Sequence, residues 1–221
     1  LKLGAKALHI SRRLRRTQEL KERWNPAMSS LAAALGAESA VNSQPRREPI
    51  APEALFDAVK AIPKKWKPAD CASCLAILSR DDFAEVNARD GDGSTALHFA
   101  AYRGLNDVCL AILGHSKFTE VNAKDGGGRT ALQYAISCSL EDVCLAILGH
   151  SEFTEVNTKY RDGSILLHEA GGLGLNNVCL AILGHSEFTE VNAKDGDGST
   201  ALHCAAFWGL SDVCLAILGH S

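Results

Sequence analysis

Apolar residues recur along this chain in a pattern that repeats itself. The string VCLAILGHS occurs four times at intervals of 35 residues, beginning at Val108, Val143, Val178 and Val213. A degenerate earlier copy runs from Cys74 to Asn87, so that five copies span about residues 70 to 221. A fixed period of this length indicates a repeat architecture, in which each copy folds as the same small unit.

Each period predicts a turn followed by two short helices, as the copy from Asp90 to Ser116 illustrates. Its DGDG start favours a tight hairpin-like turn, because glycine adopts positive φ without steric cost and aspartate bonds its own backbone. Thr95 then caps a short, alanine-rich first helix, which ends at Gly104. Asn106 caps the second helix, and Gly114 ends that helix in the C′ position.

One such unit has apolar residues on several sides and is too small to bury them alone. Each buried side chain of a second helix contributes about 1.5 to 3 kcal/mol, so stacked units are stable where a single unit is not. The pattern therefore predicts an all-α solenoid of helix-turn-helix repeats with short hairpin turns. In the fourth copy, Gly171 and Gly172 lie within the first helix and should fray it, at a cost of about 1 kcal/mol per glycine.

The repeated unit resembles the ankyrin repeat. Asp90 to Gly104 reads DGDGSTALHFAAYRG, and Thr200 to Gly209 carries the same Thr-Ala-Leu-His pattern. The resemblance covers about 150 of the 221 residues, with departures such as Gln133 for the histidine and Ser139 for the glycine of the third copy. It implies an ankyrin-type solenoid in which the Thr–His pair is structural and the concave groove and hairpin tips bind partners.

We divide the chain into three parts. Residues 1–51 form a basic helical extension and a linker. Residues 52–69 form an N-terminal capping helix, which starts with proline at a favourable N1 position, and a loop. Residues 70–221 form the ankyrin-repeat array of about 4–5 units with the 35-residue period. Because a solenoid needs a polar outer cap and none follows the last second helix, we expect this array to be truncated and the natural protein to continue beyond Ser221.

The first 24 residues differ in kind from the rest. Their basic residues are opposed only by Glu19 and Glu22, and apolar residues from Leu3 to Leu14 follow helical spacing, as in a basic amphipathic helix. Such a helix can be the remnant of a targeting segment, an anchor on an anionic membrane surface, or a docking helix for an acidic partner. A solvated extension without a role is an equally good interpretation.

Composition narrows the class of protein. The chain is 46% hydrophobic and 22% charged with a mean hydropathy of -0.03, which is typical of globular proteins. No apolar run approaches the 18 to 20 or so residues of a membrane-spanning helix. Eight cysteines are too dilute for a disulfide scaffold, and no apolar signal peptide is visible. We therefore expect an intracellular, cytoplasmic protein, or an organellar one if residues 1–24 belong to a targeting segment.

The net charge of -3 hides an uneven distribution. Residues 1–68 contain 14 Lys and Arg against 6 Asp and Glu, a net +8, whereas residues 69–221 contain 9 against 20, a net -11. The chain is thus a basic head on an acidic solenoid. We expect partners of the repeats to be basic and partners of the head to be acidic, unless the basic head and the acidic repeats neutralise each other's charge.

The cysteines raise a zinc or redox hypothesis, because Cys71 and Cys74 form a C-x-x-C pair. The period explains most of them differently, since five occupy one position on successive second helices: Cys74, Cys109, Cys144, Cys179 and Cys214. Packed helix axes lie about 8 to 10 Å apart, whereas tetrahedral zinc needs sulfurs only about 4 Å apart. We interpret these five as a ladder of small buried hydrophobic residues and expect no metal and no cofactor.

The histidines form two further series. One lies beside the capping threonine, and the resemblance implies that it is structural: His98, His168 and His203. The other follows the second helix, whose C-terminus favours an imidazolium: His115, His150, His185 and His220. The sequence contains no Ser-His-Asp constellation, phosphate-cradling glycine loop or zincin motif. We predict that the protein is not an enzyme and has no small-molecule substrate.

Function is then expected at surface positions that vary among the copies. They lie in the turns and just before the residue that ends each first helix, and the resemblance places them on the concave groove and hairpin tips. We predict that the partner-binding residues are Arg89, Asp92, Tyr102, Arg103, Lys124, Arg129, Arg161, Leu173, Lys194, Phe207 and Trp208. Tyr, Trp and Arg are enriched in binding hot spots. For Trp208, the alternative to partner binding is that the ring packs under a following repeat unit.

These observations predict a protein-binding scaffold or adaptor that presents rigid side chains to another protein, whose identity the sequence does not give. The alternative is a localisation or docking module, in which residues 1–24 bind an anionic membrane, nucleic acid or import machinery and the repeats merely follow.

Overall fold

The computed structural model describes residues 50, 51, 53–63 and 67–220. Residues 50–221 form one compact unit. The predicted basic helix of residues 1–24, most of the linker and Pro52 lie outside the described residues.

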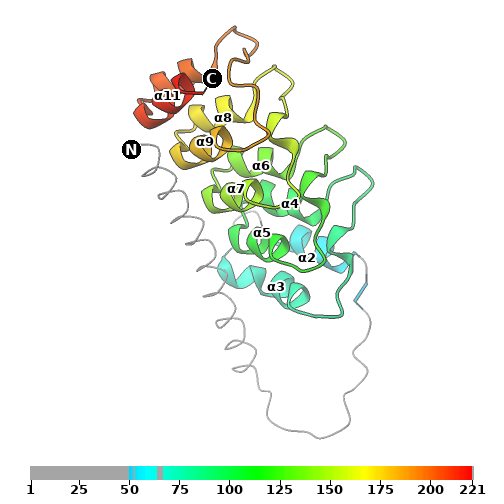
Figure 1. Cartoon of the computed structure of the whole chain (residues 1–221). Coiled ribbons are helices and arrows are strands. Elements are labelled where there is room, and N and C mark those ends of the chain that lie inside the picture. Colours follow the sequence, from blue (N-terminus) through cyan, green and yellow to red (C-terminus); the bar gives the residue numbers. More distant parts are fainter. Residues whose placement is uncertain (1–49, 52, 64–66, 221) are drawn as a thin grey trace, which may run out of the picture. The chain divides into compact units, whose positions relative to one another are not determined.

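Ten short α-helices in the described residues form five successive pairs (Figure 1). The first helices of the pairs are α2 (Ala54–Ala61), α4 (Ala96–Tyr102), α6 (Ala131–Ser137), α8 (Leu166–Gly172) and α10 (Ala201–Phe207). The second helices are α3 (Ala72–Leu78), α5 (Asn106–Leu113), α7 (Glu141–Leu148), α9 (Asn176–Leu183) and α11 (Ser211–Leu218). Short 3-10 turns complete the chain path: η1 (Pro68–Cys71), η2 (Glu85–Asn87), η3 (Glu120–Asn122) and η4 (Glu155–Asn157).

Hairpins project from the stack of helices between consecutive pairs (Figure 1). A single antiparallel bridge closes each of four hairpins: Arg89–Thr95, Lys124–Thr130, Lys159–Ile165 and Lys194–Thr200. First helices pack on first helices and second helices on second helices, so that each pair contacts the pairs beside it. The predicted all-α solenoid is therefore confirmed for the described part of the chain.

The core runs through the stack without interruption. In α5, Val108, Cys109 and Ile112 are fully buried, and the equivalent residues of α7 and α9 are buried as well. At the N-terminal end, α2 packs on α3 and α4 and buries Leu55 and Val59. The capping helix thus serves as the first helix of the first pair.

The helix ends differ from the predicted ones. Asn106 is the first residue of α5 and not its cap, because the buried Leu105 holds the N-cap position. Gly114 is the C-cap of α5, with φ -82°, and not the C′ residue that we predicted. The glycine with a left-handed conformation at the helix ends is Gly104, at φ 74° between the paired helices. The tight turn that it makes places Leu105, rather than a polar side chain, at the start of α5.

The predicted fraying of the fourth copy is also wrong. Helix α8 extends through Gly172 and is as long as α4 and α6. Gly171 is buried, and a Cβ built on it would lie 3.6 Å from the Cβ of Cys204 in α10. Packing against the neighbouring helix therefore outweighs the low helix propensity of glycine here.

The helices of the described residues are too short or too polar to cross a membrane.

Candidate functional site

The hairpins are shaped by an aspartate that binds its own turn. In the hairpin of residues 124–130, the Asp125 carboxylate accepts hydrogen bonds from the amides of Gly127 (2.8 Å) and Arg129 (2.9 Å) and from the Tyr134 hydroxyl (2.6 Å). Burial disfavours the charged carboxylate, but these three hydrogen bonds outweigh it and lower the pKa of Asp125. The turn is thereby held in one conformation.

Ion pairs join three of the four hairpins to the unit that follows them. Arg89 pairs with Glu120, Lys124 with Glu155 at 2.7 Å, and Lys159 with Glu190 at 3.1 Å. The predicted site residues Arg89 and Lys124 therefore have a partner within the array. Such half-exposed pairs contribute only about 0 to 1 kcal/mol each.

The Thr95–His98 pair anchors α4 to the hairpin that follows it. His98 Nδ1 accepts the Thr95 N–H (3.1 Å), so the Thr95 hydroxyl must donate to the same nitrogen (2.8 Å). The proton then resides on Nε2, which donates to the carbonyls of Ala123 (3.1 Å) and Arg129 (3.2 Å). Burial lowers the pKa of His98 and keeps the ring neutral. This geometry agrees with the structural role that the resemblance implies.

The predicted aromatic and aliphatic site residues lie at the C-terminal ends of first helices, and all are exposed. The exposed fractions are 64% for Tyr102, 43% for Leu173, 83% for Phe207 and 56% for Trp208. The Tyr102 ring packs edge-on against Tyr134, with ring centroids 5.8 Å apart. We call these four residues the helix-end surface.

Arg103 lies next to Tyr102 but is bound within the array. Its guanidinium donates hydrogen bonds to the carbonyls of Lys60 (2.9 Å) and Ile62 (2.8 Å) at the end of α2. The side chain therefore joins α4 to the C-terminus of α2, whose free carbonyls need donors.

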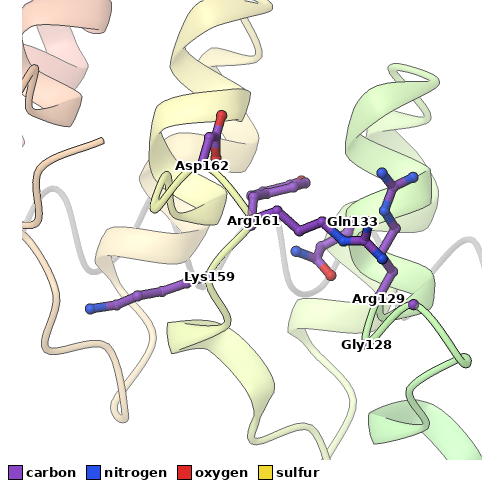
Figure 2. Close-up of a pocket in the computed structure, with 8 residues that line it drawn as sticks. Gly128, Arg129, Gln133, Lys159, Arg161 and Asp162 are labelled. Carbon is purple, nitrogen blue, oxygen red and sulfur yellow. The ribbon is translucent and has the colours of Figure 1, made fainter. Parts of the chain in front are cut away.

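The remaining predicted residues lie at the hairpin tips. Asp92 and Lys194 are exposed, and the Asp92 carbonyl accepts the Gly126 N–H at 2.6 Å. Arg129 and Arg161 come together at a pocket of about 240 Å³ between hairpins 124–130 and 159–165 (Figure 2).

Two residues that line this pocket, Gln133 and Tyr160, were not among the predicted site residues. Gln133 is buried, and its Oε1 accepts the Thr130 N–H at 3.0 Å in place of a histidine nitrogen. Tyr160 stands where the other hairpins have an aspartate, and its hydroxyl is buried. Their departure from the repeat was the signal in the sequence that could have identified them.

The cysteine ladder is buried as predicted over most of its length. Cys74, Cys109, Cys144 and Cys179 have no exposed surface, and all eight cysteines are free thiols. Burial raises the pKa of Cys74 to about 11 and that of Cys179 to about 12, so these thiols stay protonated at neutral pH. Within the described ranges, no three His, Cys, Asp or Glu side chains gather as they would around a metal ion.

The stacked helix pairs and projecting hairpins define the described part of the chain as a helical repeat solenoid. A family model described as "Ankyrin repeats (3 copies)" matches residues 60–160. Residues 60–160 thus carry ankyrin repeats, which confirms the resemblance for that part of the chain. A search of curated proteins found no significant match.

Proposed function

We propose that this chain is a scaffold or adaptor that captures another protein on the helix-end surface and the hairpin tips. Ankyrin repeats are in general protein-interaction modules and are typically non-catalytic. The observation that carries the proposal is the exposure of Tyr102, Leu173, Phe207 and Trp208 at equivalent places on a framework that otherwise repeats closely.

Exposure at these places does not depend on the end of the array. Tyr102 and Leu173 belong to units with neighbours on both sides and are nevertheless 64% and 43% exposed. A following unit would therefore not have to cover Phe207 and Trp208. Large exposed aromatic rings are costly in water and are enriched in binding hot spots, which favours a role in binding.

The test is partner capture by alanine variants. Replacing Tyr102, Phe207 and Trp208 together should remove at least one protein that the tagged chain retains from a cell lysate, because the variant loses the anchoring rings. Asp142→Ala, at an exposed position in the first turn of α7, is the control and should retain every partner. If the triple variant keeps all partners, the helix-end surface is not the binding site.

A second candidate function is docking through residues 1–24, which the division of charge favours. Deleting these residues should abolish salt-sensitive binding to anionic vesicles and leave protein capture intact. Vesicle binding that survives the deletion would contradict this candidate.

We also propose an intracellular location, and the eight free cysteines support it because disulfides form in oxidising compartments.

A further inference from the structure

The pocket between hairpins 124–130 and 159–165, which we call the central hairpins, differs from every other junction of the array. Arg161 extends from one central hairpin toward Arg129 of the other (Figure 2). The pocket between them has a volume of about 240 Å³, enough for one side chain of a partner. Tyr160 forms part of its wall.

The pocket exists because Arg161 replaces a glycine. At the preceding junction, Gly126 donates its N–H to the carbonyl of Asp92 at 2.6 Å, and a Cβ on Gly126 would lie only 3.1 Å from that oxygen. Gly196 approaches its preceding hairpin as closely, with a Cβ position 3.0 Å from a carbonyl oxygen. A residue with a side chain cannot come so close to the carbonyl oxygen of the preceding hairpin, so Arg161 separates the central hairpins.

A second replacement removes the carboxylate that would pair with Arg161. A Cβ on Gly127 would lie 3.9 Å from the Arg161 guanidinium. The other hairpins have an aspartate at the position of Gly127, namely Asp92, Asp162 and Asp197. An aspartate at this position would place its carboxylate beside the guanidinium. With glycine here, the nearest carboxylate to this Cβ position is that of Asp125, whose Oδ1 lies 3.1 Å away.

The two arginines differ from the lysines of the same hairpins. Both lysines form ion pairs with glutamates of the following unit. Arg129 and Arg161 form no ion pair with a carboxylate of the described chain, and both side chains are exposed. The Arg129 guanidinium lies over the Tyr134 ring, 5.7 Å from its centroid, which orients it.

We propose that this pocket binds the carboxylate of an aspartate or glutamate side chain of a partner protein, with Arg129 and Arg161 as its donors. Planar guanidinium groups bind carboxylates through two parallel hydrogen bonds, which gives both strength and orientation. The inference rests on the proposed function and adds a charge preference to it.

The preference is local and opposes the charge of the whole array. Residues 69–221 contain 9 Lys and Arg against 20 Asp and Glu, which repels an acidic segment in general. Each central hairpin contains two basic residues and one acidic residue, whereas hairpins 89–95 and 194–200 each contain one basic and two acidic residues. An acidic segment is therefore attracted at the central hairpins and repelled on both sides of them.

The test is a titration of the full chain with a hexaglutamate peptide, followed by the backbone amide signals in NMR. A residue-resolved measurement is needed because the basic residues 1–24 should also attract this probe. The amides of Gly127, Gly128 and Arg161 should shift and saturate, while those of Gly91 and Gly196 should not.

Two substitutions restore the residues of the neighbouring hairpins. Arg129→Ser and Arg161→Gly together should raise the Kd measured at the pocket amides about tenfold or more, because two charged donors are lost. Arg161→Gln keeps most of the side chain's size without its charge and should weaken binding in the same direction. Lys117→Gln removes an equal charge at an exposed position outside the hairpins and is the control, for which the Kd should stay within about twofold.

Pocket amides that do not respond to hexaglutamate would overturn the inference, as would an unchanged Kd in the arginine variants or an equal loss in Lys117→Gln. Inorganic phosphate that saturates the same amides at a lower concentration than hexaglutamate would overturn the assignment to a carboxylate. If hexaglutamate fails while the Tyr102, Phe207 and Trp208 variant still loses a partner, the proposed function stands and only the pocket's role falls.

Discussion

At the scale of single residues, one residue other than glycine has a positive φ in the described part of the chain. Ser139 has φ 53°, in the left-handed region, where the other units have Gly104, Gly174 and Gly209 at φ 74°, 70° and 67°. A residue with a Cβ pays a steric cost in this region that glycine does not.

Ser139→Gly should therefore raise the free energy of unfolding by about 1 kcal/mol, measured by urea denaturation. The reciprocal variant Gly104→Ser should lower it by a similar amount. A Ser139→Gly protein that is no more stable than the parent would show that the surrounding array relieves the strain.

A second feature of single residues is the pH-sensitive contact of His98. Burial lowers the pKa of His98 in the folded state below its ordinary value of 6.5, so the folded chain favours the neutral ring. The unfolded chain binds the proton more readily. The neutral His98 ring therefore contributes to the stability of the folded chain above about pH 6.5. This contribution is lost as the pH falls from about 6.5 toward the pKa of His98 in the folded state.

His98→Gln should reduce the loss of stability between about pH 7.5 and about pH 5.5, because glutamine does not titrate. Gln133 shows that glutamine is accommodated at the equivalent position, where its Oε1 accepts the Thr130 N–H. The measurement is the free energy of unfolding of both proteins at the two pH values. Equal pH dependence in both would exclude His98 as the source.

At the scale of elements, an asparagine in each of the turns η2, η3 and η4 bonds to the unit that follows. Asn157 donates to the Glu187 carbonyl at 2.7 Å and accepts the Thr189 N–H at 3.0 Å. Asn87 and Asn122 make the equivalent bonds. Asn192 holds the same position in the last described unit and is exposed.

Asn157→Ala should lower the free energy of unfolding by about 1 to 3 kcal/mol, because it leaves a backbone amide and a carbonyl without their partner. Asn192→Ala is the matched control and should change it by no more than about 0.5 kcal/mol. Equal losses in the two variants, measured by urea denaturation, would mean that the bonds between units do not matter for stability.

The 35-residue period was enough to predict the helix pairs, their stacking and the buried cysteine ladder. It did not predict the helix ends, because the turn at Gly104 and Leu105 depends on burial of Leu105 between units. Nor did it predict that α8 stays intact, since Gly171 is supported by a residue 33 positions away, Cys204. Contacts between units decide these features, and a local pattern does not contain them.

The candidate site was predictable in part. The variable positions identified the exposed Tyr102, Leu173 and Phe207 and the pocket residues Arg129 and Arg161. The sequence did not show that the Arg103 guanidinium bonds to the end of α2, because that contact joins positions about 40 residues apart.

At the scale of the whole molecule, each helix pair of the described residues packs on the pairs beside it, so that a regular framework carries a surface that varies from unit to unit. A rigid framework limits the conformational entropy that is lost when a partner binds. The helix-end surface can therefore be changed residue by residue without disturbing the core beneath it.

The most direct test of this account is photo-crosslinking from the helix-end surface. A benzophenone amino acid at position 102 or 173 of the full chain should form a covalent adduct with the captured partner, whereas the same group at position 142 should not. Adducts from position 142 alone, or equally from all three positions, would contradict the proposal that the partner lies on the helix-end surface.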